Sequence, residues 1–198
     1  MYTIIEDCSP YYIRFTHNGI NDVIDKCSQY IEHKKFTRAF THHIHPPAEA
    51  ESILASVPLT SQLDINVNRV SSFVTQPGVY YRVHKDGLDC RTSINYTVKI
   101  LDDKCVTSWY SDQDVQCAAF EGLDWKIPSR EVSGFDQTSC VPLKSMTAKQ
   151  GECILFNTDI FHDFDNSNSQ DERTVLTLRL NRPGEYSFDE IKKILFGI

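Results

Sequence analysis

A histidine and an aspartate two positions apart are the first residues of this sequence whose types and spacing can do chemistry. His84 and Asp86 lie at the end of the segment 78–84, whose β-branched and aromatic residues predict a strand. Alternate side chains of a strand share a face, so both residues point the same way if the extended backbone persists through Asp86. Together they can bind one metal ion, with a third ligand from elsewhere. Taken alone, the pair more often marks a surface turn that ends a strand.

His162 is the candidate for that third ligand. It follows the apolar segment Cys153–Asn157, which predicts another strand. Two histidines and one carboxylate on one side of a metal, with the other positions open, form the ligand set of non-haem Fe(II) oxygenases. The open positions are the functional point, because a co-substrate and O₂ must both reach the iron.

These residues, in order and with Arg173 eleven positions after His162, resemble the 2-oxoglutarate/Fe(II)-dependent dioxygenase superfamily. Two stretches resemble its prolyl- and aspartyl/asparaginyl-hydroxylase-like branch: residues 83–96, with VHKDG and then RTSINY, and residues 155–176, with LFNTDIFH and then ERTVL. The similarity covers about residues 75–182 and leaves the first 60 residues unassigned.

The resemblance implies a mostly β fold: a double-stranded β-helix (jelly roll, cupin-like), with the iron near one open end. It also implies oxidative decarboxylation of 2-oxoglutarate to succinate and CO₂, coupled to oxidation of a second substrate, usually its hydroxylation. By the same resemblance His84, Asp86 and His162 are the metal ligands and the catalytic centre. Fe(II) is then the cofactor, and 2-oxoglutarate and O₂ are the co-substrates.

Arg173 matches the family position that binds the remote 5-carboxylate of 2-oxoglutarate. A guanidinium suits this task, because it can pair with a carboxylate through two parallel hydrogen bonds. On the predicted strand 173–180, one face carries Leu176, Leu178 and Leu180, and the face that could line a polar cavity carries Arg173, Val175, Thr177 and Arg179.

Position 175 is valine, which departs from the Arg-x-Ser form of some branches of the family. A hydroxyl partner for the 5-carboxylate must then come from elsewhere, with Tyr80, Tyr81 and Tyr96 as candidates. We expect Tyr80 and, on weaker grounds, Asn95 to contact the co-substrate. Arg179 is a candidate second clamp, although an exposed or ion-paired strand residue is the commoner case.

The elements that position these residues follow from hydrophobic periodicity and turn residues. Helical spacing predicts helices over 18–33, over 48–54 after Pro46-Pro47, and over 187–196, where Ser187 and Glu190 form a capping-box pattern. Between them the signal is strand-like, with segments at 78–84, 91–100, 105–110, 152–157 and 173–180.

No helical period interrupts residues 64–180, which disfavours alternating β and α units, and no glycine-rich nucleotide motif is present. We therefore expect one domain over 1–198, with flanking N- and C-terminal helices. A helical N-terminal buttress would span about 1–63, a jelly-roll core about 64–182 and a C-terminal helix about 187–197.

The composition is that of an ordinary globular chain, with 40% hydrophobic and 24% charged residues among 198. A net charge of −7 disfavours nucleic acid and anionic membranes as partners, and neither a membrane span nor a signal peptide is visible. The seven cysteines are scattered, without a CxxC pair. Free thiols in a reducing, cytoplasmic setting fit this pattern.

Two other polar clusters invite a metal interpretation. His42-His43-x-His45 has no predicted strand or carboxylate beside it, so an ordinary polar loop is the favoured interpretation, with substrate contact or adventitious metal binding behind it. Asp163 and Asp165, next to His162, are expected in a solvated loop.

The leading functional hypothesis is an Fe(II)/2-oxoglutarate oxygenase that hydroxylates a peptide or protein side chain or a small metabolite. The alternative is a jelly roll of the cupin or lectin kind that binds a metal or ligand without redox chemistry. A third is a metal-dependent isomerase or other cupin enzyme, although those sites usually begin with His-x-His. The substrate would be set by loops over the barrel mouth, here residues 111–140 and the segment before Gly78.

Overall fold

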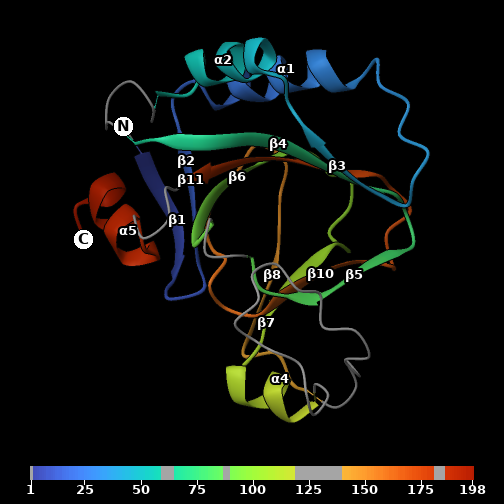
Figure 1. The fold of residues 1–198 in the computed structure, drawn as a ribbon, viewed down its shortest axis with the longest axis vertical. Coiled ribbons are helices and arrows are strands. Elements are labelled where there is room, and N and C mark those ends of the chain that lie inside the picture. Colours follow the sequence, from blue (N-terminus) through green and yellow to red (C-terminus); the bar gives the residue numbers. More distant parts are fainter. Residues whose placement is uncertain (1, 59–64, 87–89, 119–139, 181–185) are drawn as a thin grey trace.

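A computed structural model describes residues 2–58, 65–86, 90–118, 140–180 and 186–198 of the chain (Figure 1). Its strands pair in antiparallel fashion throughout. The elements, in chain order, are β1 (Tyr2–Cys8), β2 (Tyr12–His17), α1 (Ile20–Ile31), β3 (Phe40–Ile44), α2 (Pro47–Ala55), β4 (Val67–Thr75), β5 (Val79–His84), β6 (Thr92–Lys99), β7 (Val106–Trp109), α4 (Asp112–Ala118), β8 (Lys144–Thr147), β9 (Cys153–Asn157), β10 (His162–Asn166), β11 (Arg173–Leu180) and α5 (Phe188–Phe196).

The strands form two sheets, one with the order β1-β2-β9-β6-β11-β4-β3 and one with the order β5-β10-β7-β8. The eight strands from β4 to β11 contribute β4-β11-β6-β9 to the first sheet and β5-β10-β7-β8 to the second. This alternation between two facing sheets is a double-stranded β-helix, or jelly roll. The expected fold class, mostly β with flanking helices, is the one observed.

The outer face of the seven-stranded sheet is covered by helices, which gives the molecule its main core. Helix α1 buries one stripe of apolar residues, Ile20, Val23, Ile24, Cys27 and Ile31, as the helical spacing predicts. These pack with Leu176 and Leu178 of β11 and with Ile191 of α5 in one cluster. Figure 1 shows α1 and α2 over this sheet and α5 beside β1. The main core therefore lies between this sheet and the helices, and the opposite face of the sheet is turned toward the second sheet.

The helix termini agree with the local sequence. Ser187 caps α5 through the predicted capping box: its hydroxyl accepts from the Glu190 backbone N–H, and the Glu190 carboxylate accepts from the Ser187 backbone N–H. Each of these bonds satisfies a backbone donor that the first turn of a helix would otherwise leave without a partner.

The N-terminal third differs from the expected helical buttress. Besides α1 and α2 it supplies β1, β2 and β3, which extend the first sheet at both edges. β1 and β3 are edge strands, and most of their residues are half-buried or exposed, so they lack the apolar pattern of a covered strand. A short helix, α4, also lies between β7 and β8, in the span where we expected strands alone.

The free cysteines agree with the expectation from the sequence. Free thiols are present at Cys8, Cys27, Cys90, Cys105, Cys140 and Cys153. Among the described residues no helix has the length and apolar character needed to cross a bilayer.

The helix-covered core should dominate stability. Leu155 on β9 is fully buried in it, so Leu155→Ala should lower the free energy of unfolding by about 2–5 kcal/mol. Leu101 is 67% exposed, and Leu101→Ala should change the free energy of unfolding by less than about 0.5 kcal/mol. Urea denaturation of both variants makes the comparison, and equal effects would contradict this assignment of the core.

Candidate metal and co-substrate site

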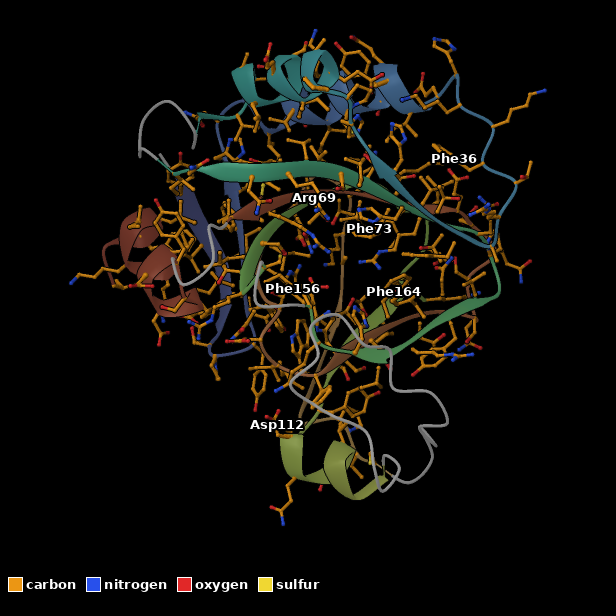
Figure 2. All side chains as sticks on the ribbon, viewed as in Figure 1. Phe36, Arg69, Phe73, Asp112, Phe156 and Phe164 are labelled. Atoms are coloured by element: carbon orange, nitrogen blue, oxygen red, sulfur yellow. The ribbon has the colours of Figure 1, made fainter. Side chains whose placement is uncertain are left out.

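A cavity of about 370 Å³ lies between the two sheets, and all the predicted site residues except Tyr80 line it. Figure 2 shows Arg69, Phe73, Phe156 and Phe164 in this space. Tyr12, Trp109, Met146 and Ile154 fill a neighbouring part of the molecule as a separate apolar cluster. The ionisable side chains that line the cavity are His42, Arg69, His84, Asp86, His162, Asp163, Arg173 and Arg179.

Strand alternation decides which side chains of the first sheet reach the cavity. On β11 it is lined by Arg173, Val175, Thr177 and Arg179, whereas Leu176, Leu178 and Leu180 belong to the helix-covered core. This division is the one predicted from the sequence. On β6, Ser93 and Asn95 line the cavity. The Ser93 hydroxyl donates to Asn95 Oδ1 at 3.2 Å, which leaves the Asn95 amide nitrogen as a donor on the cavity side.

His84 and His162 are brought together by the pairing of β5 with β10. They stand opposite each other in the ladder, and their ring centroids lie 4.3 Å apart. In each ring Nδ1 lies 2.8 Å from a backbone carbonyl oxygen, that of Arg82 for His84 and that of Ile160 for His162. A carbonyl oxygen only accepts, so Nδ1 carries the proton and Nε2 presents a lone pair. This is the tautomer that a metal-binding histidine needs.

His162 is also held in its neutral form. Burial, and next the neighbouring His84, lower its pKa to about 3. A metal binds the neutral imidazole, so no proton has to leave His162 before a metal can bind near neutral pH.

Asp86 lies two residues beyond the end of β5 and lines the same cavity. Its backbone N–H donates to the Thr158 carbonyl at 3.3 Å, which holds the chain beside the segment that leads to His162. Its carboxylate Oδ1 lies 3.6 Å from Arg179 Nη2. The structure therefore pairs Asp86 with Arg179. A divalent ion at the imidazoles would compete with this single positive charge for the carboxylate.

Asp163 is a buried residue of β10, not part of the solvated loop that we expected. Its carboxylate accepts hydrogen bonds from the Tyr110 hydroxyl at 2.8 Å, the Ser108 backbone N–H at 3.1 Å and the Tyr80 hydroxyl at 3.2 Å. These donors come from β5, from β7 and from the residue after β7, so one carboxylate ties together the strands around His162. The sequence offered no signal for this role beyond the position of Asp163 next to a candidate ligand.

Arg173 is a buried cation with no carboxylate paired to it in the described part of the chain. It is 8% exposed, its guanidinium carbon lies 5.0 Å from the centre of the Phe164 ring, and its Nε has no hydrogen-bond partner. Moving a charge out of water without a partner costs several kcal/mol. A bound anion would offset that cost, so the cavity wall at Arg173 is suited to a carboxylate.

A bulge in β5 decides which tyrosine reaches the cavity. In the pairing with β10, His84 is opposite His162 and Tyr81 is opposite Phe164, so β5 has one more residue than β10 between these pairs. The extra residue places Tyr81 on the same side as His84, and Tyr81 lines the cavity. Tyr80, our expected co-substrate contact, is not among the lining residues, because its hydroxyl donates to a buried carboxylate of β10.

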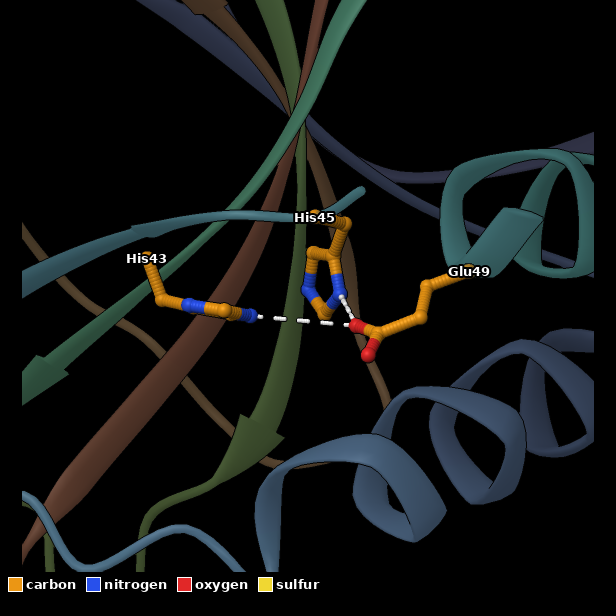
Figure 3. A group of neighbouring side chains, drawn as sticks. All are labelled: His43, His45 and Glu49. Carbon is orange, nitrogen blue, oxygen red and sulfur yellow. Dashed lines mark hydrogen bonds and ion pairs between the residues drawn. The ribbon is translucent and has the colours of Figure 1, made fainter. Parts of the chain in front are cut away.

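The His42-His43-x-His45 cluster is divided by its own strand. His42 lines the cavity and stacks on Phe73, with ring centroids 4.5 Å apart. His43 and His45 lie with Glu49 of α2, their ligand atoms all within 4.8 Å of one another (Figure 3). The cluster is therefore not the plain polar loop that the sequence favoured.

The group of His43, His45 and Glu49 is already occupied by a cation of the protein. Lys34 Nζ lies 2.7 Å from His43 Nε2 and 3.1 and 3.2 Å from the two Glu49 carboxylate oxygens. His45 bridges Glu49 and the Ser72 hydroxyl, at 2.9 and 2.7 Å. All three potential ligands thus have protein partners, and a metal would have to displace Lys34. The arrangement ties α2 and the segment after α1 to β3 and β4.

Part of the expected substrate-determining loop is outside the described residues. Of the span 111–140, the structure describes 111–118, with α4, and residue 140. Residues 119–139 are not described.

The fold is shared with solved oxygenase structures, although no protein-family model and no curated protein matches the sequence. An oxidoreductase of the 2OG-Fe(II) oxygenase family from Burkholderia pseudomallei superposes with a TM-score of 0.57, 9% identity and coverage of 89% of this chain and 87% of that one. The epimerase SnoN, in complex with Fe³⁺ and alpha ketoglutarate, superposes with a TM-score of 0.55 at 7% identity. The match covers 88% of this chain and 82% of that one. The viral collagen prolyl hydroxylase vCPH from Paramecium Bursaria Chlorella virus-1 superposes with a TM-score of 0.51 at 14% identity. The match covers 88% of this chain and 98% of that one. At these identities the likeness shows the fold, the double-stranded β-helix.

Metal binding can be assigned to one of the two histidine clusters by paired substitutions. His162→Ala should weaken Mn(II) binding by more than the roughly 10- to 100-fold that loss of an outer partner costs, because it removes a ligand atom. His43→Ala should leave the affinity unchanged. Calorimetric titration of the metal-free proteins measures both. A loss of affinity in His43→Ala alone would place the metal beside Glu49 instead.

The buried His45 should make stability depend on pH. Burial lowers its pKa in the folded protein below the usual value, so the unfolded chain binds more protons as the pH falls below about 6.5. The free energy of unfolding should therefore decrease from pH 7 to pH 5.5, and less steeply in His45→Gln. Urea denaturation across this range measures the slope. His33→Gln, at an exposed position outside the cluster, should keep the wild-type slope, and equal slopes in all three proteins would contradict the assignment.

Proposed function

We propose that this protein is an Fe(II)- and 2-oxoglutarate-dependent oxygenase that hydroxylates a peptide or protein side chain or a small metabolite. His84, Asp86 and His162 would hold the iron, and Arg173 would bind the 5-carboxylate of 2-oxoglutarate. The observation that carries the proposal is the buried Arg173, which shares one cavity with two imidazoles that present their Nε2 atoms. The free thiols fit a reducing compartment, and we place the protein in the cytoplasm.

The donor set supports Fe(II) in particular. Imidazole nitrogens and a carboxylate oxygen suit iron, and two histidines with one carboxylate leave positions open for other ligands. Bound there, Fe(II) would supply the O₂ chemistry that couples decarboxylation of 2-oxoglutarate to oxidation of a second substrate. The remaining contributions come from residues of this chain: they orient the ligands, bind the co-substrate and restrict water.

The two proposed binding groups are separated by a suitable distance along β10. Arg173 lies over the ring of Phe164, which is two residues beyond His162 on that strand. Two residues of an extended strand span about 7 Å. A five-carbon dicarboxylate that binds the metal with one end can therefore place its other carboxylate at Arg173. Asn95 faces the same cavity and offers an amide donor beside this path.

Aromatic rings limit how much water this path can hold. The rings of Tyr81 and Phe164 stack, with centroids 5.1 Å apart and planes 8° from parallel. Phe40 packs on Tyr81 with centroids 4.3 Å apart. In such apolar surroundings a pair between Arg173 and a carboxylate is stronger than it would be in water. Arg173 is thus preorganised for an anion, since no carboxylate of the described chain competes for it.

The function is tested by succinate formation and by 2-oxoglutarate affinity. With Fe(II), O₂ and ascorbate as reductant, the wild-type protein should convert 2-oxoglutarate to succinate and CO₂, slowly even without the second substrate. Truncating one partner of a buried charge pair costs about 2–5 kcal/mol, so Arg173→Gln should raise the apparent dissociation constant of 2-oxoglutarate by about 30-fold or more. Mn(II) affinity should stay unchanged, since Arg173 is not a metal ligand.

Lys104 provides a matched control on the exposed turn between β6 and β7. Lys104→Gln removes a positive charge outside the cavity and should leave 2-oxoglutarate affinity unchanged. Binding of 2-oxoglutarate without any succinate would favour the alternative, a jelly roll that binds ligands without redox chemistry. If Arg179→Gln lost more affinity than Arg173→Gln, the carboxylate would be assigned to the other arginine of the same strand face.

A further inference from the structure

The cavity carries more positive charge than the proposed co-substrate can use. Among the described residues, its walls hold three guanidinium groups, those of Arg69, Arg173 and Arg179, and two carboxylates, those of Asp86 and Asp163. A bound Fe(II) and a dianionic 2-oxoglutarate cancel each other in charge. The excess of one positive charge therefore persists in the loaded site. It stands out in a chain whose net charge is −7.

Arg69 and Arg179 face each other at one end of the cavity. They are directly opposite in the β4–β11 pair, where two like charges are unfavourable. Arg179 has Asp86 3.6 Å away and an Nε without a hydrogen-bond partner, whereas no ion pair or hydrogen bond joins Arg69 to another residue of the described chain. Burial, and next the guanidiniums of Arg179 and Arg69, lower the pKa of the neighbouring His42 to about 4, so this imidazole is neutral at neutral pH. Among the described residues, Asp86 is thus the only carboxylate that forms an ion pair with either of these two guanidiniums.

This pair is separate from the proposed 2-oxoglutarate position. Arg179 is six residues after Arg173 on β11, which is about 20 Å of extended strand. Arg179 lies beside Asp86, on the metal side, and Arg173 lies over Phe164, deeper along β10. His42, a cavity-lining residue of β3, is partly exposed, so this end of the cavity opens to solvent. A second substrate can reach the metal from here without crossing the co-substrate.

An apolar surface adjoins the two arginines. Phe73 lies on β4 with its side chain on the same face as Arg69, and Phe40 stacks on it with centroids 5.7 Å apart. The His42 ring covers Phe73 in a nearly parallel stack, with planes 14° apart. A planar or apolar group can therefore pack beside the guanidiniums, in contact with these uncharged rings.

Building on the proposed function, we propose that the second substrate is an anion: a phosphate or carboxylate that Arg69 and Arg179 bind together, on a planar or apolar body that contacts Phe73. Guanidinium groups bind both anions through paired, charge-assisted hydrogen bonds. The anion separates the two like charges, and its body extends toward the open positions of the metal. Neutral peptides and uncharged metabolites are then poor substrates.

Phenyl phosphate and phenol, which differ in the anionic group, are the probes for this site. Calorimetry on protein loaded with Mn(II) and 2-oxoglutarate should give a dissociation constant for phenyl phosphate of about 1 mM or lower, and phenol should bind at least about tenfold more weakly. Arg69→Gln and Arg179→Gln should each weaken phenyl phosphate by about tenfold or more. Arg38→Gln, at an exposed arginine outside the cavity, should leave phenyl phosphate affinity unchanged. Benzoate in place of phenyl phosphate distinguishes carboxylate from phosphate preference.

Equal affinity for phenol and phenyl phosphate would overturn the inference, and so would unchanged phenyl phosphate affinity in both Arg69→Gln and Arg179→Gln. The same titrations without metal and 2-oxoglutarate separate the two proposals. Phenyl phosphate binding that depends on Arg69, in a protein that binds neither Mn(II) nor 2-oxoglutarate, would support the anion site and contradict the oxygenase. Binding of Mn(II) and 2-oxoglutarate without phenyl phosphate would contradict the anion site alone.

Discussion

The antiparallel pairing of β5 with β10 is the interaction on which the candidate site depends. It sets His84 opposite His162, although the two residues are far apart in the sequence. The buried carboxylate of Asp163 holds this pairing against β7 through donors on both neighbouring sides. Each imidazole is then fixed by a backbone carbonyl close to it in the chain. The orientation of the two imidazoles thus depends on the small sheet together with the Ile160 carbonyl, which lies just before β10.

The seven-stranded sheet supplies the opposite wall of the cavity, and its two faces are chemically different. One face is apolar and covered by α1, α2 and α5, while the other presents arginines, small polar residues and aromatic rings to the cavity. Burial of the leucines on β11 fixes the register of that strand, since a slip of one residue would exchange the two faces. The positions of Arg173 and Arg179 are therefore secured by hydrophobic packing on the opposite side of the sheet.

Features of the fold and of the candidate site that depend on a single strand or helix could be predicted from the sequence. The face of β11, the stripe of α1 and the capping box of α5 follow from local periodicity, and the structure has each of them. Tyr81 could not be distinguished from Tyr80, because the bulge that exchanges their faces depends on the pairing with β10. The burial of Asp163 likewise depends on hydroxyl donors from other strands.

The edge strands show a different limit of sequence reasoning. β1 and β3 are only partly covered, so their sequences lack a marked apolar face. The division of the three histidines after Thr41 became clear only once β3 was known to be a strand. His42 then belongs to the cavity and His43 to the layer beneath the helices. The alternation of side chains along a strand separates His42 from His43 correctly, but the sequence did not identify β3 as a strand.

The lysine between His43 and Glu49 bears on how the protein would acquire its metal in a cell. Two groups of histidines and carboxylates lie on opposite sides of the seven-stranded sheet, and a metal ion would be partitioned between them. An ammonium group tethered at Lys34 acts as a permanent local competitor at one of them, at an effective concentration that free ions do not reach. Mis-metallation of that group is thereby suppressed. The cavity, whose imidazole Nε2 atoms remain available, is left as the favoured destination for an incoming ion.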